Sequence, residues 1–217
     1  MFEIIPSPGT DNKSFADIEK KIALVKPFAK TIHVDVIDGK FAKNTTFSDP
    51  TPFAQFSKDF LLEVHLMVEE PILYLKPWAD AGFQRFIGQV EKMSDQSAFV
   101  ADAQMLGDVA LAIGKQTPID AITVPLRDLD SLLVMTIQAG FSGQQFEESL
   151  LEKVKLLRAK TELPIEVDGG INDETILIAA SAGATRFVAT SFLFSVASPE
   201  DQYHLLLEEL KKLHISS

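Results

Sequence analysis

The fold class that this sequence predicts is α/β, with one (β/α)8 barrel domain spanning residues 1–217. Strand-like and helix-like segments alternate in about eight units, each roughly 20–30 residues from the next. The strand-like segments are mostly continuous apolar runs, which is typical of parallel strands covered by helices on both faces. Eight such units without a linker between them favour a closed barrel over an open doubly wound sheet.

The first two units follow from apolar patterning and helix-end signals. Residues 2–5 form a short apolar strand that ends in a segment rich in turn residues. Ser14 stands where an N-cap is expected, before the amphipathic segment 15–25, which predicts the first helix. The second strand is expected at 31–37, followed by a long loop and a helical turn or two at 50–56.

The third and fourth units are bounded in the same way. An apolar strand is predicted at 61–68, and Pro71 marks the start of a helix at 72–81. Gly82 follows the last helical residue, where a C-terminal stop is expected, and strand-like residues resume at 83–90.

The second half of the chain repeats the pattern, with glycines at 107 and 183 ending two of its helices. Further strands are predicted at 108–113, 131–137, 164–168 and 185–189. Further helices are predicted at 95–106, from 117 to about 124, and at 147–159, 173–182 and 199–213. The short fifth helix, from 117, is the weakest element of the pattern.

Composition and charge exclude several classes of function. The chain carries 20 basic and 31 acidic residues, a net charge of −11, and has no basic cluster. Nucleic acid and anionic membrane are therefore not expected as partners, and a phosphorylated ligand would need local backbone donors. The absence of cysteine excludes disulfides, thiolate metal sites and a cysteine nucleophile. No secretory leader and no apolar run near the roughly 18 residues of a spanning helix is seen, so a cytoplasmic location is expected.

The strand at 31–37 has an unusually polar face. Alternation places His33 and Asp35 on the same side as Ile37, and the three other apolar residues on the opposite side. An imidazole and a carboxylate two residues apart are a poor way to build a core. They are a natural way to present two ligands to a metal ion.

Four residues on three strands are the candidate metal ligands. His33 and Asp35 on the second strand, His65 on the third and Asp168 on the seventh all occupy the carboxyl ends of their strands, where barrels of this type place their active sites. Taken singly, each histidine could be a satisfied core residue, and Asp168 could serve the turn at the two glycines that follow it. Taken together, they predict a site with two histidine and two aspartate ligands.

Loops rich in glycine or serine follow strands six, seven and eight, at 140–144, 169–170 and 190–191. In barrels these are the loops that bind phosphate, through backbone N–H groups and a helix N-terminus. Glycine permits the close approach of the backbone to an anion. A phosphate site beside the predicted metal ligands is therefore expected.

The sequence of these candidate site residues and their neighbours resembles that of a known family, the ribulose-phosphate 3-epimerases and their relatives acting on ketose phosphates. The resemblance runs from Ile4 to about Phe194 and covers nearly the whole chain. Its most specific segments are HVDVIDGKF at 33–41 with NTTF at 44–47, VHLMV at 64–68, VMTI at 134–137 with GFSGQ at 140–144, and EVDGGIN at 166–172.

The resemblance implies a role for each candidate residue. One divalent metal ion, zinc, manganese, iron or cobalt, would be held by His33, Asp35, His65 and Asp168, with Asp35 and Asp168 also forming the acid/base pair. Ser7 would lie near the substrate, and Met67 and Met135 would line the site, whereas a third methionine of the family is Ile37 here. The phosphate would be bound by Gly140, Ser142, Gly143, Gly170, Thr190 and Ser191.

The implied reaction is a metal-dependent epimerisation at C3 of a ketose phosphate. The substrate would be D-ribulose 5-phosphate, giving D-xylulose 5-phosphate, or a related pentulose or hexulose phosphate. Inversion requires that a proton leaves one face of the carbon and another returns to the opposite face. Two carboxylates on opposite sides of an ene-diolate meet this need, and the metal acts as a Lewis acid on the oxygens.

Several positions near the site depart from the family pattern. They are the segment 8–12 after Ser7, Gln89 in place of a histidine, the segment 114–118, the pair at 138–139, and Ser142 and Thr190 in place of glycines. These changes leave open which ketose phosphate is the substrate, and whether activity is kept, redirected or lost.

An alternative function is a homologue without turnover that binds metal and a phosphorylated ligand in a structural or regulatory role. Related barrels that decarboxylate or synthesise ketose phosphates are a third option, but the second-strand motif lacks a lysine to serve them. Assembly into a homo-oligomer is left open by the sequence.

Overall fold

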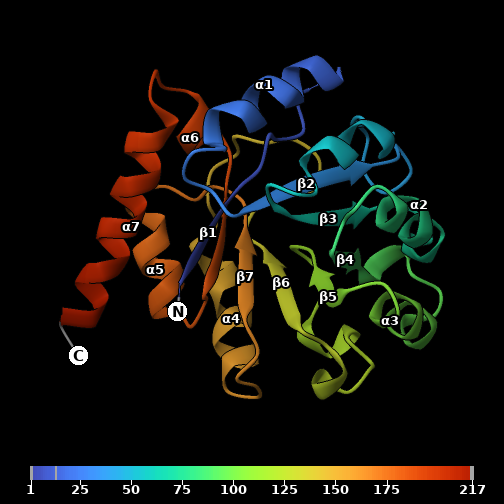
Figure 1. The fold of residues 1–217 in the computed structure, drawn as a ribbon. Coiled ribbons are helices and arrows are strands. Elements are labelled where there is room, and N and C mark those ends of the chain that lie inside the picture. Colours follow the sequence, from blue (N-terminus) through green and yellow to red (C-terminus); the bar gives the residue numbers. More distant parts are fainter. Residues whose placement is uncertain (1, 13, 216–217) are drawn as a thin grey trace.

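Eight parallel strands form one sheet that curls into a nearly closed barrel in this computed structural model, which describes residues 2–12 and 14–215, with side chains to residue 213 (Figure 1). The predicted fold class is confirmed. The strands are β1 (Glu3–Pro6), β2 (Thr31–Ile37), β3 (Leu61–Met67), β4 (Arg85–Gln89), β5 (Asp108–Ile113), β6 (Ser131–Met135), β7 (Ile165–Asp168) and β8 (Arg186–Ala189).

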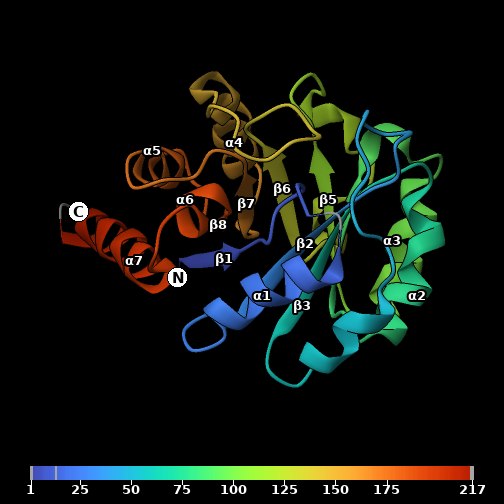
Figure 2. The same cartoon turned by 90° about the horizontal axis from the view of Figure 1, so that it is seen from above.

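The helices lie around the outside of the barrel, as Figure 2 shows from above. They are α1 (Phe15–Val25), α2 (Leu75–Asp80), α3 (Gln96–Gln104), α4 (Leu151–Arg158), α5 (Thr175–Ser181), α6 (Ser191–Phe194) and α7 (Pro199–Ile215). Short 3₁₀ segments occupy Thr51–Phe56, Pro71–Tyr74, Val90–Lys92, Ile119–Ala121, Leu126–Asp128 and Glu148–Leu150. None of the helices in the described part of the chain is long and apolar enough to cross a membrane.

The predicted fifth helix is wrong. Residues 114–130 between β5 and β6, all of them described, contain two 3₁₀ turns and no α-helix. Pro125 lacks an N–H and disfavours helical geometry at Val124, so a helix begun at Pro118 has no room to propagate. The Ser14 side chain also makes no capping bond to the backbone and instead donates to Asp17.

Alternation along the strands divides the buried residues into two layers. On β2, Ile32, Val34 and Val36 pack outward in the main hydrophobic core between sheet and helices. His33, Asp35 and Ile37 face the interior of the barrel, as the pattern predicted. A smaller apolar cluster inside the barrel joins Ile37 to residues of β3 to β6, namely Met67, Ile87, Ala110, Ala112, Leu133 and Met135.

The barrel has a seam between β1 and β2. β1 pairs with β8 and β2 pairs with β3, and no backbone ladder joins β1 to β2 among the described residues. Two side-chain hydrogen bonds bridge this seam instead. Thr31 Oγ1 donates to Glu3 Oε1 at 2.6 Å, and Ser7 Oγ donates to Asp35 Oδ2 at 3.1 Å.

Candidate active site

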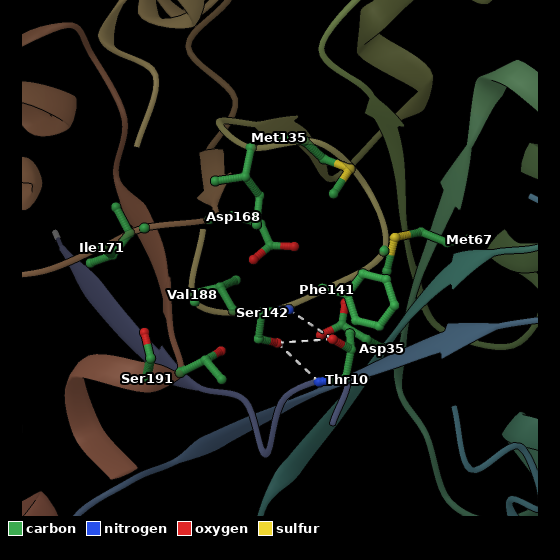
Figure 3. Close-up of a pocket in the computed structure, with 16 residues that line it drawn as sticks. Thr10, Asp35, Met67, Met135, Phe141, Ser142, Asp168, Ile171, Val188 and Ser191 are labelled. Atoms are coloured by element: carbon green, nitrogen blue, oxygen red, sulfur yellow. Dashed lines mark hydrogen bonds between the residues drawn. The ribbon is translucent and has the colours of Figure 1, made fainter. Parts of the chain in front are cut away.

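A pocket of about 450 Å³ opens at the carboxyl ends of the strands (Figure 3). Asp35 and Asp168 enter it from β2 and β7, and the loop after β6 forms one of its walls. Ten of the residues predicted from the sequence or the resemblance line it: Asp35, Met67, Met135, Gly140, Ser142, Gly143, Asp168, Gly170, Thr190 and Ser191. The strand ends therefore gather the predicted site residues at one end of the barrel.

The four predicted metal ligands form one cluster. A potential ligand atom of each lies within 4.8 Å of those of the others. Asp35 Oδ1 is 3.2 Å from His33 Nε2 and 3.2 Å from His65 Nδ1, and Asp168 Oδ2 is 3.6 Å from that same Nδ1. Both histidines are fully buried, whereas each aspartate is 9% exposed, so the carboxylates and not the imidazoles reach the pocket.

The cluster shifts the pKa values of its members strongly. Burial by itself lowers the pKa of His65, but hydrogen bonds to Asp168 and Asp35 outweigh burial and raise it to about 9. Burial opposes protonation of His33 too, yet Asp35 and the glutamates around it raise that pKa well above its usual value. Despite its burial, Asp35 has a pKa far below its usual range because both imidazoles lie beside it. Positive charge is therefore strongly favoured at this cluster.

Beneath the cluster lies a second buried group that the sequence analysis missed. His33 Nδ1 is 2.7 Å from Glu63 Oε1 and 3.3 Å from Glu166 Oε1, and Arg85 donates to Glu63 Oε2 at 2.6 Å. Despite burial, His33 and Arg85 lower the pKa of Glu63 to about 2, whereas burial and the charge of Glu63 raise the pKa of Glu166 to about 7. Contact with Glu63 turns His33 so that Nε2 faces Asp35.

Strand alternation was the available signal for this second group. Glu63 lies two residues before His65 and Glu166 two residues before Asp168, so both share the inward face of a predicted ligand. With His33, they form another set of groups close enough to hold a cation.

Ser7 and the two methionines take different positions around the pocket. Met67 and Met135 line it. Ser7 is fully buried and lies behind Asp35, to which it donates a hydrogen bond, and it is not part of the pocket wall. The resemblance placed it near the substrate, and the structure places it against a candidate acid/base residue.

The loops predicted to bind phosphate, after β6, β7 and β8, all line the pocket. Gly143 has a φ of +80°, and a Cβ on it would meet nothing within 4 Å, so its backbone is open to the pocket. Gly170 has a φ of +69°, and a Cβ there would lie 2.8 Å from the backbone nitrogen of Phe146. Only glycine fits this second position, which keeps the loops after β6 and β7 in close contact.

Comparison with known proteins gives the family. A model of the ribulose-phosphate 3 epimerase family matches residues 7–194. The chain belongs to the ribulose-phosphate 3-epimerase family. It is 34% identical over 203 residues to the ribulose-phosphate 3-epimerase of Candida glabrata, covering 85% of this chain and 82% of that one. It is 35% identical over 205 residues to the cytoplasmic isoform of Oryza sativa subsp. japonica, covering 89% and 88%.

Solved structures support the barrel fold. The KGPDC from Streptococcus mutans superposes with a TM-score of 0.73 at 12% identity, covering 98% of this chain and 99% of that one. A 3-hexulose-6-phosphate synthase gives a TM-score of 0.68 at 16% identity, covering 95% and 99%. The family and its named members make this chain an isomerase, a carbohydrate-phosphate epimerase.

The donor set of this epimerase fits a divalent metal ion. Two imidazole nitrogens and two carboxylates without thiolate suit zinc, manganese, iron or cobalt. His33 also has the second hydrogen bond that metal-ligating histidines make, here to Glu63. The residues present therefore fit the group that the resemblance implies.

Two departures from the family pattern contact each other across the mouth of the pocket. Thr10 N donates to Ser142 Oγ at 3.0 Å, and Ser142 N donates to Thr10 Oγ1 at 2.9 Å. The two hydroxyls lie 3.1 Å apart, and Figure 3 shows these contacts. We call this Thr10–Ser142 contact the loop latch, because it joins the loop after β1 to the loop after β6. The sequence marked both positions as departures but could not predict their contact, since 132 residues separate them.

Proposed function

We propose that this epimerase inverts C3 of a ketose phosphate, with D-ribulose 5-phosphate and D-xylulose 5-phosphate as the first pair to test. One observation carries the proposal: the carboxylates of Asp35 and Asp168, from strands on different sides of the barrel, enter one pocket and lie next to the same nitrogen of His65. The sequence relatives named above are epimerases acting on ribulose phosphate.

The two carboxylates account for the proton transfers. A ketose has an acidic proton at C3, next to the carbonyl carbon, and one aspartate takes that proton as a base. The other aspartate returns a proton to the opposite face of the resulting ene-diolate. In each direction the aspartate that starts ionised is the base and the other starts protonated as the acid, so the proton taken by one is matched by the proton given by the other. The reverse reaction exchanges the two roles.

The histidines hold the carboxylates and do not reach the pocket themselves. His65 lies between Asp35 and Asp168, and His33 is fixed by Glu63. A divalent metal bound by His33, Asp35, His65 and Asp168 would supply Lewis-acid stabilisation of the negative charge that develops on the substrate oxygens.

The loops after β6, β7 and β8 supply the phosphate site in this proposal. Gly143 and Gly170 present backbone, and Thr190 and Ser191 present hydroxyls, on the same side of the pocket. A chain with net charge −11 needs such local donors to bind an anion. The phosphate end of the substrate would lie there, with the reacting carbon next to the aspartates.

Deuterium exchange at C3 tests the proposal. Metal-loaded protein is incubated in D₂O with D-ribulose 5-phosphate and several pentulose and hexulose phosphates, and C3 deuteration is followed by NMR. Exchange with at least one of them is expected. If protein shown to carry metal exchanges none of them, the catalytic function is refuted and the alternative of a binding homologue is favoured.

Replacement of Asp168 tests its role as one of the two proton-transfer groups. Asp168→Asn keeps the shape of the side chain but removes the proton acceptor, so epimerisation is expected to fall by about a thousandfold or more. Asp173→Asn, five residues along the same loop, is the control and should retain activity. Activity of Asp168→Asn within about tenfold of the parent would remove this residue from the acid/base pair.

We propose the cytoplasm as the compartment, as for the cytoplasmic isoform from Oryza sativa.

A further inference from the structure

A large cleft adjoins the active-site pocket above β4, β5 and β6. Its volume is about 1150 Å³, and it shares Gly140 and Phe141 with the pocket. Figure 3 labels Phe141 among the residues that line the pocket. A pentulose phosphate bound between the aspartates and the phosphate loops would leave this cleft unfilled.

The lining of the cleft is basic in a strongly acidic protein. Of the described residues, three lysines, Lys43, Lys92 and Lys115, line it together with one acidic residue, Glu91. Lys43 and Lys92 are exposed, and neither ammonium group has a hydrogen-bond or ion-pair partner in the part of the chain that the structure describes. Two cations are therefore available to a ligand.

The other two charged side chains of the cleft, Lys115 and Glu91, have partners within the protein. Lys115 Nζ lies 2.5 Å from Glu147 Oε1. Glu91 Oε1 accepts hydrogen bonds from Gly114 N at 2.6 Å and from the Thr117 hydroxyl at 2.5 Å. Glu91 keeps its negative charge, so with Lys115 offset by Glu147 the lysines Lys43 and Lys92 leave the cleft with one net positive charge, which favours an anionic ligand.

Gln89 gives an independent indication of a ligand. It is fully buried at the end of β4 and lines the cleft. Its Nε2 donates to the sulfur of Met135 at 3.4 Å, and its Oε1 has no partner among the described residues. Buried carbonyl oxygens are rarely left without a donor. A hydroxyl group of a ligand in the cleft would supply one.

The positions of the pocket and cleft determine which end of the substrate enters the cleft. The aspartates and the phosphate donors Gly143, Gly170, Thr190 and Ser191 line the pocket and not the cleft. Gln89, at the end of β4, and Lys92 line the cleft and not the pocket. A 2-ketose phosphate held by its phosphate at the loops and by C2 and C3 at the aspartates has only its C1 end directed toward the cleft. The cleft can therefore distinguish substrates by the size and charge of the group at C1.

We propose that the cleft binds a second anionic group, at the C1 end of the substrate, and that the preferred substrate is a doubly anionic ketose such as a ketose bisphosphate. Lys43 and Lys92 bind the second anion, and Gln89 Oε1 accepts a hydrogen bond from a substrate hydroxyl. This inference rests on the proposed function, because it assumes the same reaction at C3.

The test compares C3 deuteration of D-ribulose 5-phosphate and D-ribulose 1,5-bisphosphate in D₂O. For the parent, kcat/KM for the bisphosphate is expected to exceed that for the monophosphate by at least tenfold. In the double variant Lys43→Met with Lys92→Met, this ratio is expected to fall by at least tenfold. The control, Lys58→Met with Lys211→Met, neutralises two exposed lysines away from the cleft and should keep the parent ratio.

The two proposals fail in different ways. If the monophosphate is exchanged at least as well as the bisphosphate and the double variant keeps the parent ratio, the second anion site is refuted and the epimerase function stands. If the ratio falls equally in the control pair, the effect is one of overall charge and the assignment to the cleft is refuted. Exchange of neither sugar, nor of any other ketose phosphate, refutes the epimerase function itself.

Discussion

Asp35 connects the parts of the site at the scale of single residues. Its Oδ1 faces both histidines, and its Oδ2 accepts a hydrogen bond from Ser7. The same carboxylate also reaches the pocket. Its orientation is thus fixed by neighbours on β1, β2 and β3, and any loss among them should affect catalysis before it affects the fold.

Ser7→Ala tests this dependence. The variant removes the donor to Asp35 Oδ2 within a fully buried contact, and hydrogen bonds to charged groups contribute about 1.5–3 kcal/mol. We expect kcat to fall roughly tenfold or more. Steady-state kinetics measure the effect, with Ser14→Ala, at the exposed start of α1, as the control. A kcat within twofold of the parent would show that Ser7 does not position Asp35.

The raised pKa of His65 predicts a pH dependence of stability for protein stripped of divalent metal by a chelator. The pKa rises from 6.5 to about 9 on folding, so the folded state binds the proton more tightly than the unfolded state. The resulting stabilisation, up to about 3 kcal/mol, is fully present below pH 6.5 and is lost as the pH rises through 9.

Urea unfolding between pH 6 and 9.5 measures this effect. The free energy of unfolding is expected to fall across that interval, and His65→Asn should flatten the fall. His204→Asn, on the exposed face of α7, is the control. An equally steep fall in His65→Asn would assign the dependence to other groups.

Alternation predicted which side chains of β2 and β3 face the interior, because it depends only on the period of a strand. It could not predict what those side chains contact. Glu63 bonds to Arg85 and His33, which lie on the two neighbouring strands, and Glu166 reaches His33 across the barrel. Such contacts depend on strand register and barrel closure, neither of which is encoded locally.

At the scale of elements, the strands were predicted more closely than the helices. β2 and β5 have the predicted ends. The helix expected at 147–159 begins with a 3₁₀ turn and becomes α-helical only at Leu151. The four-residue helix α6 was not predicted. Apolar periodicity does not separate 3.0 from 3.6 residues per turn in short segments, and the first turn adapts to the loop that enters it.

The loop latch is expected to hold the loop after β6 in place when no substrate is bound. Ser142→Ala removes the acceptor for Thr10 N and the contact between the hydroxyls. Net hydrogen-bond contributions of about 0.5–1.5 kcal/mol imply amide exchange about twofold to tenfold faster at residues 140–144. Hydrogen-exchange mass spectrometry provides the measurement.

A double-mutant cycle with Thr10→Ala tests whether the two residues act together. The loss of exchange protection in the double variant should be smaller than the sum of the losses in the two single variants, because each single variant already breaks the shared contact. Ser94→Ala, whose hydroxyl bonds to Glu70 on another loop, is the control. Unchanged exchange in Ser142→Ala would show that the loop is held by its backbone alone.

At the scale of the whole molecule, the barrel followed from the repeat of strand and helix, because right-handed crossovers permit few other arrangements of eight units. The seam between β1 and β2 could not be predicted. A ladder there depends on the relative tilt of two short strands, which the packing of the entire barrel sets. The family resemblance likewise did not predict the seam.

At the seam, ligand binding is expected to stabilise the closure of the barrel. Among the described residues, β1 and β2 each have an edge without a ladder partner, and one of the side-chain bridges across the seam ends on Asp35, a candidate metal ligand. A ligand that holds Asp35 therefore also holds two sheet edges together, and its binding energy adds to the stability of closure.

We expect chelation of divalent metal to speed amide exchange in β1 and β2 more than in β5 and β6, which are laddered on both sides. Exchange rates mapped by NMR with and without chelator check this, and Thr31→Val, which removes the other bridge, should enlarge the difference. Equal acceleration in all strands would mean that the barrel opens as one unit. If the seam opens first, the residues that would bind the metal also keep the barrel closed, and removal of the metal would expose unpaired strand edges to aggregation.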